Sequence, residues 1–237
     1  MFVAGCGRGF FDPDLSGECD ASSTTAGPAP TFVQANYATS GSTQDVGTAA
    51  GFPLPQAAGN TIVAVVMWDS TSSNLMSVSD DVGNAYQTAI GPTRSPGYWS
   101  QVVYVAPNIA AAGAGVNVVH AAFTTGSFVR IAVAEYAAVD NAQPLDGTSA
   151  MVGDSTVNVT AGSITTTHVS DRLVGATSSR ISVDGNYPNF MLRESAVEFV
   201  IQDLQADTPR AYAPAAQASG NSGDWVAQLI ALRRLGY

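Results

Sequence analysis

The sequence predicts an all-β protein: a two-sheet antiparallel β-sandwich of jelly-roll type that follows a short N-terminal arm. One continuous apolar run is bounded by turn residues, and about a dozen further short strand patterns recur with turns between them. Charged residues make up only 12% of the chain, while Ser, Thr, Asn, Gln and Gly are plentiful. Such a composition is typical of extracellular β proteins.

The strongest element is the run from Ile62 to Trp68, which lies between a Gly59-Asn60 turn and an Asp69-Ser70-Thr71 turn. Its β-branched and bulky residues do not alternate with polar ones. Because a strand in the middle of a thick core loses its alternation, the run predicts a central strand covered on both faces.

Weaker strand patterns precede and follow this run. Residues 32–37 and 46–50 come before Pro53 and Pro55, and because proline cannot donate to a ladder, this section is expected at an edge or corner. Turns at Asp81-Val82-Gly83-Asn84 and at residues 124–127 predict two hairpins, with Gly83 or Asn84 at positive φ.

Residues 140–155 are expected to be a loop. The later strands are expected at 76–80, 85–90, 100–106, 116–123, 128–138, 157–164, 172–178, twice within 191–205, at 211–218 and at 225–233.

The length of 237 residues suits one large sandwich as well as two small domains. We predict one sandwich domain, residues 30–237, behind an arm and linker at 1–29. Residues 20–30 are small, polar and punctuated by proline, as linkers are.

The formal net charge is −10, and all nine basic residues are arginine. An acidic, lysine-free surface repels phosphate backbones and anionic headgroups, which argues against nucleic acid and membrane surfaces as partners. The bias towards alanine, glycine and arginine is typical of a GC-rich bacterial genome.

The two cysteines, Cys6 and Cys19, allow two interpretations. They can close a local disulfide in an oxidising compartment. Alternatively, Val3-Ala4-Gly5-Cys6 matches the end of a bacterial lipoprotein signal, in which Cys6 would carry a lipid anchor. Both interpretations predict an extracellular or cell-surface protein.

Aromatic residues near turns are the candidate binding site. Tyr98 and Trp99 follow Pro96-Gly97, and Tyr187 follows Gly185-Asn186, so their rings are expected at loop tips where they can stack on a sugar. Asn189 would add a polar contact. The alternative is that Trp99 begins a strand and packs inward, as Trp68 and Trp225 are expected to do.

Asp80, Asp81 and Asn84 are candidate oxygen ligands for calcium, although turn chemistry accounts for the same residues. His120 and Glu135 each share the side of a strand with apolar residues and could meet as a pair inside the sandwich. More often such residues are satisfied polar contacts, or one of them faces solvent at a sheet edge. His168 is expected at the surface, and the spacing of the two histidines predicts no zinc site.

No catalytic motif emerges from the chain. Gly153-Asp154-Ser155 has a nucleophile-like order but lacks an Asp-x-x-His near the C-terminus. The sequence therefore predicts a protein that is not an enzyme and needs no cofactor beyond the candidate calcium.

The segments GNTIVAVVMWD, SVSDDVGNAYQ, AVAEYAAVDNAQPLD and DWVAQLIALR, in this order, resemble a widespread class of bacterial extracellular β-sandwich domains found in cell-surface proteins. The resemblance covers residues 31–235 and implies an exported surface module. The predicted function is structural or adhesive, with self-assembly through the arm or an edge strand. The partner would be the protein itself or another surface protein. The alternatives are a carbohydrate-binding module that takes polysaccharide, and a hydrolase with an unrecognised site.

Overall fold

The computed structural model describes residues 27–40, 42–49, 51–154, 158–179, 182–184, 187–196, 198–219 and 223–236. Cys6, Cys19 and most of the expected arm lie outside these residues. The described chain folds into strands and contains no α-helix, which confirms the all-β prediction. The strands are β1 Thr31–Thr39, β2 Gln44–Thr48, β3 Thr61–Trp68, β4 Leu75–Asp80, β5 Gln87–Arg94, β6 Ser100–Ala106, β7 Val119–Ser127, β8 Val129–Ala137, β9 Leu145–Gly153, β10 Asn158–Thr160, β11 Ile164–Thr165, β12 Asp171–Ser179, β13 Ser182–Asp184, β14 Met191–Ala196, β15 Phe199–Ala206, β16 Ala211–Tyr212, β17 Ala215–Ser219 and β18 Trp225–Leu232.

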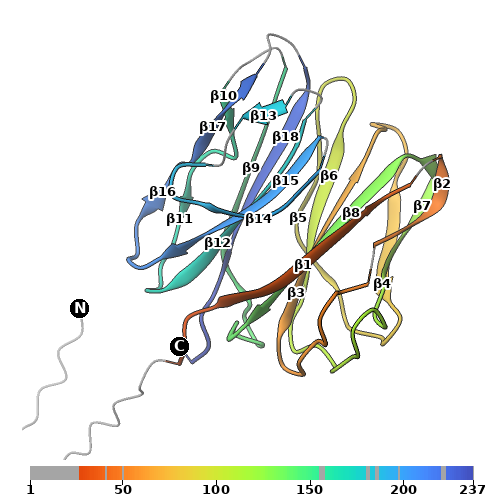
Figure 1. Cartoon of the computed structure of the whole chain (residues 1–237). Helices are drawn as coiled ribbons and strands as arrows, with labels where there is room; N and C mark the ends of the chain where they lie inside the picture. The colour runs from red at the N-terminus through yellow and green to blue at the C-terminus, as the bar shows by residue number, and fades with distance from the viewer. Residues whose placement is uncertain are drawn as a thin grey trace, which may run out of the picture.

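The strands form four layers, with the first half of the chain on the right of Figure 1 and the second half on the left. The first outer sheet has the order β2-β7-β4, and it covers the first inner sheet, β1-β8-β3-β6-β5. The second inner sheet, β14-β15-β12-β18-β9, packs against the first. Its other face is covered by β10-β17-β13 and by the short pair β11-β16.

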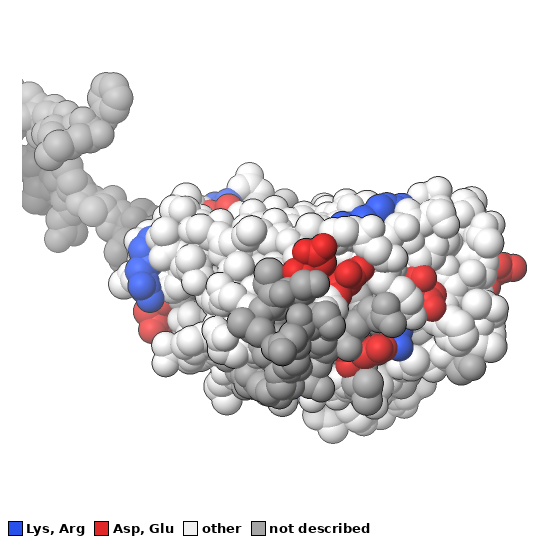
Figure 2. Space-filling view, turned by 90° about the horizontal axis from the view of Figure 1, so that it is seen from above, with Lys and Arg blue, Asp and Glu red and all other residues white. Residues whose placement is uncertain are grey.

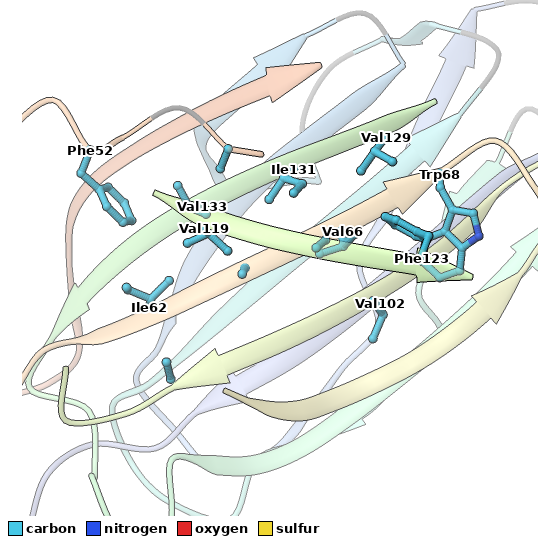
Figure 3. Close-up of a cluster of buried hydrophobic side chains, with 14 of the residues drawn as sticks. Phe52, Ile62, Val66, Trp68, Val102, Val119, Phe123, Val129, Ile131 and Val133 are labelled. Carbon is cyan, nitrogen blue, oxygen red and sulfur yellow. The ribbon is translucent and has the colours of Figure 1, made fainter. Parts of the chain in front are cut away.

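Strand β3 shows why its sequence lacks alternation. All eight of its residues are buried. Ile62, Ala64, Val66 and Trp68 point into the core below the first outer sheet, where Trp68 and Phe123 meet edge to face with their ring centroids 5.4 Å apart (Figure 3). The intervening residues, such as Val65, point into the core between the two inner sheets. The predicted central strand is therefore confirmed.

The two halves of the chain have the same strand order. The first inner sheet, β1-β8-β3-β6-β5, corresponds strand for strand to β9-β18-β12-β15-β14, and the outer sheet β2-β7-β4 corresponds to β10-β17-β13. Only β11 and β16 lack counterparts among the described strands. Edge strand β1 lies beside β14, and its counterpart β9 lies beside β5, so an approximate two-fold axis relates the halves.

The described chain therefore contains two sandwiches, where a single two-sheet sandwich was expected. The two share the apolar core between the inner sheets, which we call the middle core. The antiparallel β-sandwich itself is confirmed, whereas the jelly-roll type stays a prediction. The additional layers arise because β12 and β18, like β3, are covered on both faces.

Both predicted hairpins are wrong. Gly83 does adopt positive φ, at 79°, but β4 pairs with β7 and β5 pairs with β6, so the turn carries the chain from one sheet to another. Likewise β7 belongs to the outer sheet and β8 to the inner one. Residues 145–153, expected to be loop, form β9, an edge strand that pairs only with β18 in its sheet.

The described N-terminal segment is fixed to the second half of the chain. The Arg172 side chain donates to the Pro30 carbonyl oxygen at 2.9 and 3.1 Å, and the Arg234 guanidinium donates to the carbonyl oxygen of Gly27. Strand β1 therefore begins from an anchored position at the edge of its sheet.

Candidate functional site

The predicted aromatic platform is not present. Trp99 has no exposed surface, because the Arg130 guanidinium lies 4.9 Å from the centre of its ring and Tyr98 meets it edge to face. The loop is drawn inward by Ser95, whose hydroxyl oxygen accepts hydrogen bonds from the N–H groups of Tyr98 and Trp99. The expectation of an exposed Trp99 ring is thus wrong, and its alternative, inward packing, describes the structure.

Tyr187 is also buried, with 1% of its surface exposed. Its ring meets Phe190 edge to face at 5.3 Å, and its N–H donates to the Gln202 side chain. Asn189 is exposed at a φ of 68°, which turns the chain between these two aromatic residues. Tyr187 and Asn189 are thus neighbours, but only Asn189 reaches the solvent.

A shallow cleft of about 380 Å³ lies beside Asn189. Its aromatic residues, Phe190 and Tyr212, are each only 7% exposed, and the Arg210 guanidinium covers the Tyr212 ring at 4.2 Å. No flat aromatic face is therefore open among the described residues of this cleft, as stacking on a sugar would require.

The residues considered for calcium form a hydrogen-bonded turn. Asp80 accepts hydrogen bonds from the backbone and side-chain amides of Asn84, from the Tyr86 hydroxyl and from the Asn117 amide. Because Oδ1 of Asn84 accepts the N–H of Ala110, the Asn84 amide nitrogen must face Asp80. Asn84 therefore turns a donor, and not an oxygen ligand, towards the carboxylate, as turn chemistry predicts.

His120 and Glu135 do not meet. His120 lies on the outer sheet and contacts Asp81 at 2.9 Å. This hydrogen bond lowers the pKa of the Asp81 carboxyl. Glu135 is fully buried on β8, where its carboxylate accepts hydrogen bonds from Gln34 and Asn60, each at 2.6 Å. The two residues therefore form no pair, because consecutive strands β7 and β8 lie in different layers.

One group of titratable residues was not predicted. Asp146 near the start of β9, His168 in the loop before β12 and Asp171 at the start of β12 bring one ligand atom each within 4.8 Å of one another. Ser170, at a φ of 63°, turns the chain so that residues 168 and 171 both face Asp146. The sequence signal was weak, because Asp146 was assigned to a loop and His168 to the surface.

The open edges of the sheets form the most extensive candidate surface. In the described topology β1, β2, β4, β9 and β14 are among the strands that pair on one side only. These five strands expose large apolar side chains, which we call the edge residues. They are Tyr37, Val46, Met76, Met151, Met191 and Leu192, with exposures from 38% to 68%.

A groove of about 310 Å³ lies beside two of these edges. It is lined by the end of β1, by residues following it and by β2, including Val46 and Gly47. Residues 31–50 were expected at a sheet edge, and the positions of β1 and β2 confirm this. In Figure 2 most of the described residues on this face are uncharged, and the charged side chains form separate small groups.

Comparisons with family models, curated proteins and solved structures find no match to this chain. The resemblance to bacterial surface domains therefore stays a prediction. In the described residues, no helix has the length and apolar character needed to cross a membrane.

Proposed function

We propose that this protein is an exported surface module with a structural or adhesive role, and that it assembles with further copies of itself through its sheet edges. The observation that carries the proposal is the set of edge residues, which places exposed apolar side chains on strands with unpaired backbone groups. An edge of this kind can accept another strand and bury apolar surface in the same step.

The absence of lysine supports the same proposal. Proteins commonly protect an open edge with charged side chains, lysine above all, because a charge opposes the approach of a second strand. This chain has no lysine, and the outward positions of β2 and β4 include Val46 and Met76, which are 49% and 68% exposed. These edges therefore lack the lysine that most often opposes association.

The arrangement of the layers suits assembly in two directions. The outer sheets β2-β7-β4 and β10-β17-β13 occupy corresponding positions in the two halves and lie at opposite ends of the stack. A module with one open-edged sheet at each end can contact two neighbours at once. Repetition of that contact would extend a chain of copies, as a structural role requires.

We expect association to increase with ionic strength. Each copy carries a formal charge of −10, so copies repel one another at low salt. Raising the salt concentration from about 0.01 to 0.15 M shortens the screening length from roughly 30 to 8 Å. Sedimentation velocity over a concentration series at both ionic strengths should show oligomers that increase at the higher one.

Val46→Lys with Met76→Lys should suppress these oligomers, because the two charges oppose strand addition at β2 and β4. Val116→Lys is the matched control, because Val116 is 58% exposed but lies outside the strands. A wild-type chain that remains monomeric at both salt concentrations would contradict self-assembly, as would a double variant that associates like the wild type.

The contribution of the arm is tested by truncation. Removal of residues 1–26 keeps the anchoring carbonyls of Gly27 and Pro30, so we expect the remaining chain to fold with an unchanged melting temperature. Weaker association of the truncated chain, measured by light scattering after size-exclusion chromatography, would assign part of the contact to the arm. Unfolding of the truncated chain would show that the arm belongs to the core.

A surface location follows from the same proposal. Cys6 and Cys19 would then form a disulfide or Cys6 would carry a lipid anchor, and mass spectrometry without reduction distinguishes the two. Polysaccharide binding through Trp99 and Tyr187 has less support, because both rings are buried.

A further inference from the structure

The cluster of Asp146, His168 and Asp171 comes from two segments of the second half of the chain. Asp146 and Asp171 belong to the edge strand β9 and the central strand β12, while His168 comes from the intervening loop. Oδ1 of Asp146 lies 2.8 Å from Nδ1 of His168. The Thr167 backbone N–H and hydroxyl both donate to the Asp146 carboxylate and fix its orientation.

Asp171 is the residue that points to a ligand. It has no exposed surface, and its Oδ2 receives no hydrogen bond from any described residue. Its Oδ1 accepts a long hydrogen bond of 3.4 Å from the Arg234 backbone N–H, and the Asp146 carboxyl lies close enough to share a proton with Asp171. A buried carboxylate normally has a hydrogen-bond donor or a cation on each oxygen, so Oδ2 of Asp171 is open to one or the other.

The cluster brings two carboxyl groups and one imidazole together, so a ligand that binds all three side chains is a cation.

We propose that Asp146, His168 and Asp171 bind a divalent cation of the zinc class. An imidazole nitrogen with two carboxylates is a ligand set that zinc accepts, and solvent water can complete its tetrahedron. Calcium needs six to eight oxygen ligands, which this cluster does not offer. The His168 side chain is 20% exposed and contacts Asp146, whose side chain is 4% exposed. An ion can therefore reach the cluster from the solvent at His168.

The proposed ion would join two segments that are distant in sequence, one at Asp146 and one at residues 168–171. The strand-to-loop contact at Thr167 and Asp146 already holds the last turn before β12 against β9. A bound cation would replace the contact between His168 and Asp146 and would satisfy the buried oxygen of Asp171. The expected role is structural, as a clamp on the outer edge of the second inner sheet.

The test uses the full chain with Cys6→Ser and Cys19→Ser, so that thiols do not take up zinc. After treatment with a chelator, the protein is titrated with zinc chloride by calorimetry, and its melting temperature is followed. We expect one zinc ion per chain and a higher melting temperature, with no comparable response to magnesium or calcium chloride.

Asp171→Asn and His168→Gln should each weaken zinc binding by at least about tenfold. Asp171→Asn keeps the shape and removes a charge, so without zinc it should melt no lower than the parent chain. His120→Gln is the matched control, since the other histidine also contacts an aspartate but has no second carboxylate. It should leave zinc binding unchanged.

Three outcomes would overturn the proposal. The parent chain could show no response to zinc, in which case the two carboxyl groups share a proton in place of a metal. Zinc binding could persist in both cluster variants, which would place the ion elsewhere. Calcium could bind where zinc does not, which would exclude the zinc class. None of these outcomes bears on the self-assembly test, which changes Val46 on β2 and Met76 on β4.

Discussion

Val65→Asp is expected to unfold the whole described chain. Val65 is 1% exposed and lies in the core between the two inner sheets, together with residues of the second half such as Ile201 and Ile230. An unpaired carboxylate there costs several kcal/mol, which is comparable to the total stability of about 5–15 kcal/mol of a typical domain. Circular dichroism during heating should show no cooperative transition.

Val46→Asp is the matched control, because the same substitution on β2 changes a side chain that is 49% exposed. Surface substitutions of this kind usually change stability by no more than about 0.5 kcal/mol. If Val65→Asp melted cooperatively near the wild-type temperature, Val65 could not be buried between the two inner sheets.

Asp203→Ala is expected to lower the free energy of unfolding by about 3–5 kcal/mol. Asp203 is fully buried on β15, where Arg193 donates to both carboxylate oxygens, at 2.8 and 2.9 Å. The Tyr136 hydroxyl donates to it from the opposite inner sheet at 3.0 Å. Burial, followed by this carboxylate, raises the pKa of Tyr136, so the phenol keeps its proton and remains a donor.

Removal of the carboxylate leaves the Arg193 charge and the Tyr136 hydroxyl without their acceptor in the interface between the halves. Asp207→Ala, in an exposed position after the same strand, is the control and should have little effect on urea unfolding. Equal midpoints for the two variants would mean that Asp203 is not a structural link between the halves.

The sequence contained enough information for the central strands. Apolar and polar residues do not alternate from Ile62 to Trp68, because each face of β3 is covered by another sheet. The apolar run therefore predicts a strand that is buried on both faces. Edge positions were also predictable, since Pro53 and Pro55 limit pairing near β1 and β2. Strand β9 was missed because its residues are half exposed and include few large apolar side chains.

The number of layers could not be predicted in the same way. A strand covered on both faces does not indicate which sheet covers it, so the sequence could not distinguish one thick sandwich from two that share a core. The repeated strand order is a property of pairing, and the short strands β10 and β13 have little in common with β2 and β4 in sequence.

The site predictions depended on which side chains reach the surface. Trp99 and Tyr187 follow turn residues, as exposed rings do, yet Ser95 and Gln202 draw their backbones inward. Conversely, Asp146 and Asp171 are 25 positions apart in the numbering, and only the pairing of β9 and β12 with β18 brings them together. The burial of the two rings and the approach of the two aspartates therefore both depend on contacts between segments distant in sequence, which the local sequence pattern does not specify.

Amide hydrogen exchange measured by mass spectrometry tests most directly whether the two sandwiches are one cooperative structure. Because the middle core joins β3 and β8 to β12 and β18, the amides of these four strands should exchange last and at a common rate set by global unfolding. The edge strands β2 and β10 should exchange sooner. Exchange of β12 and β18 well before β3 and β8 would show that the second half unfolds independently, and would contradict the shared core.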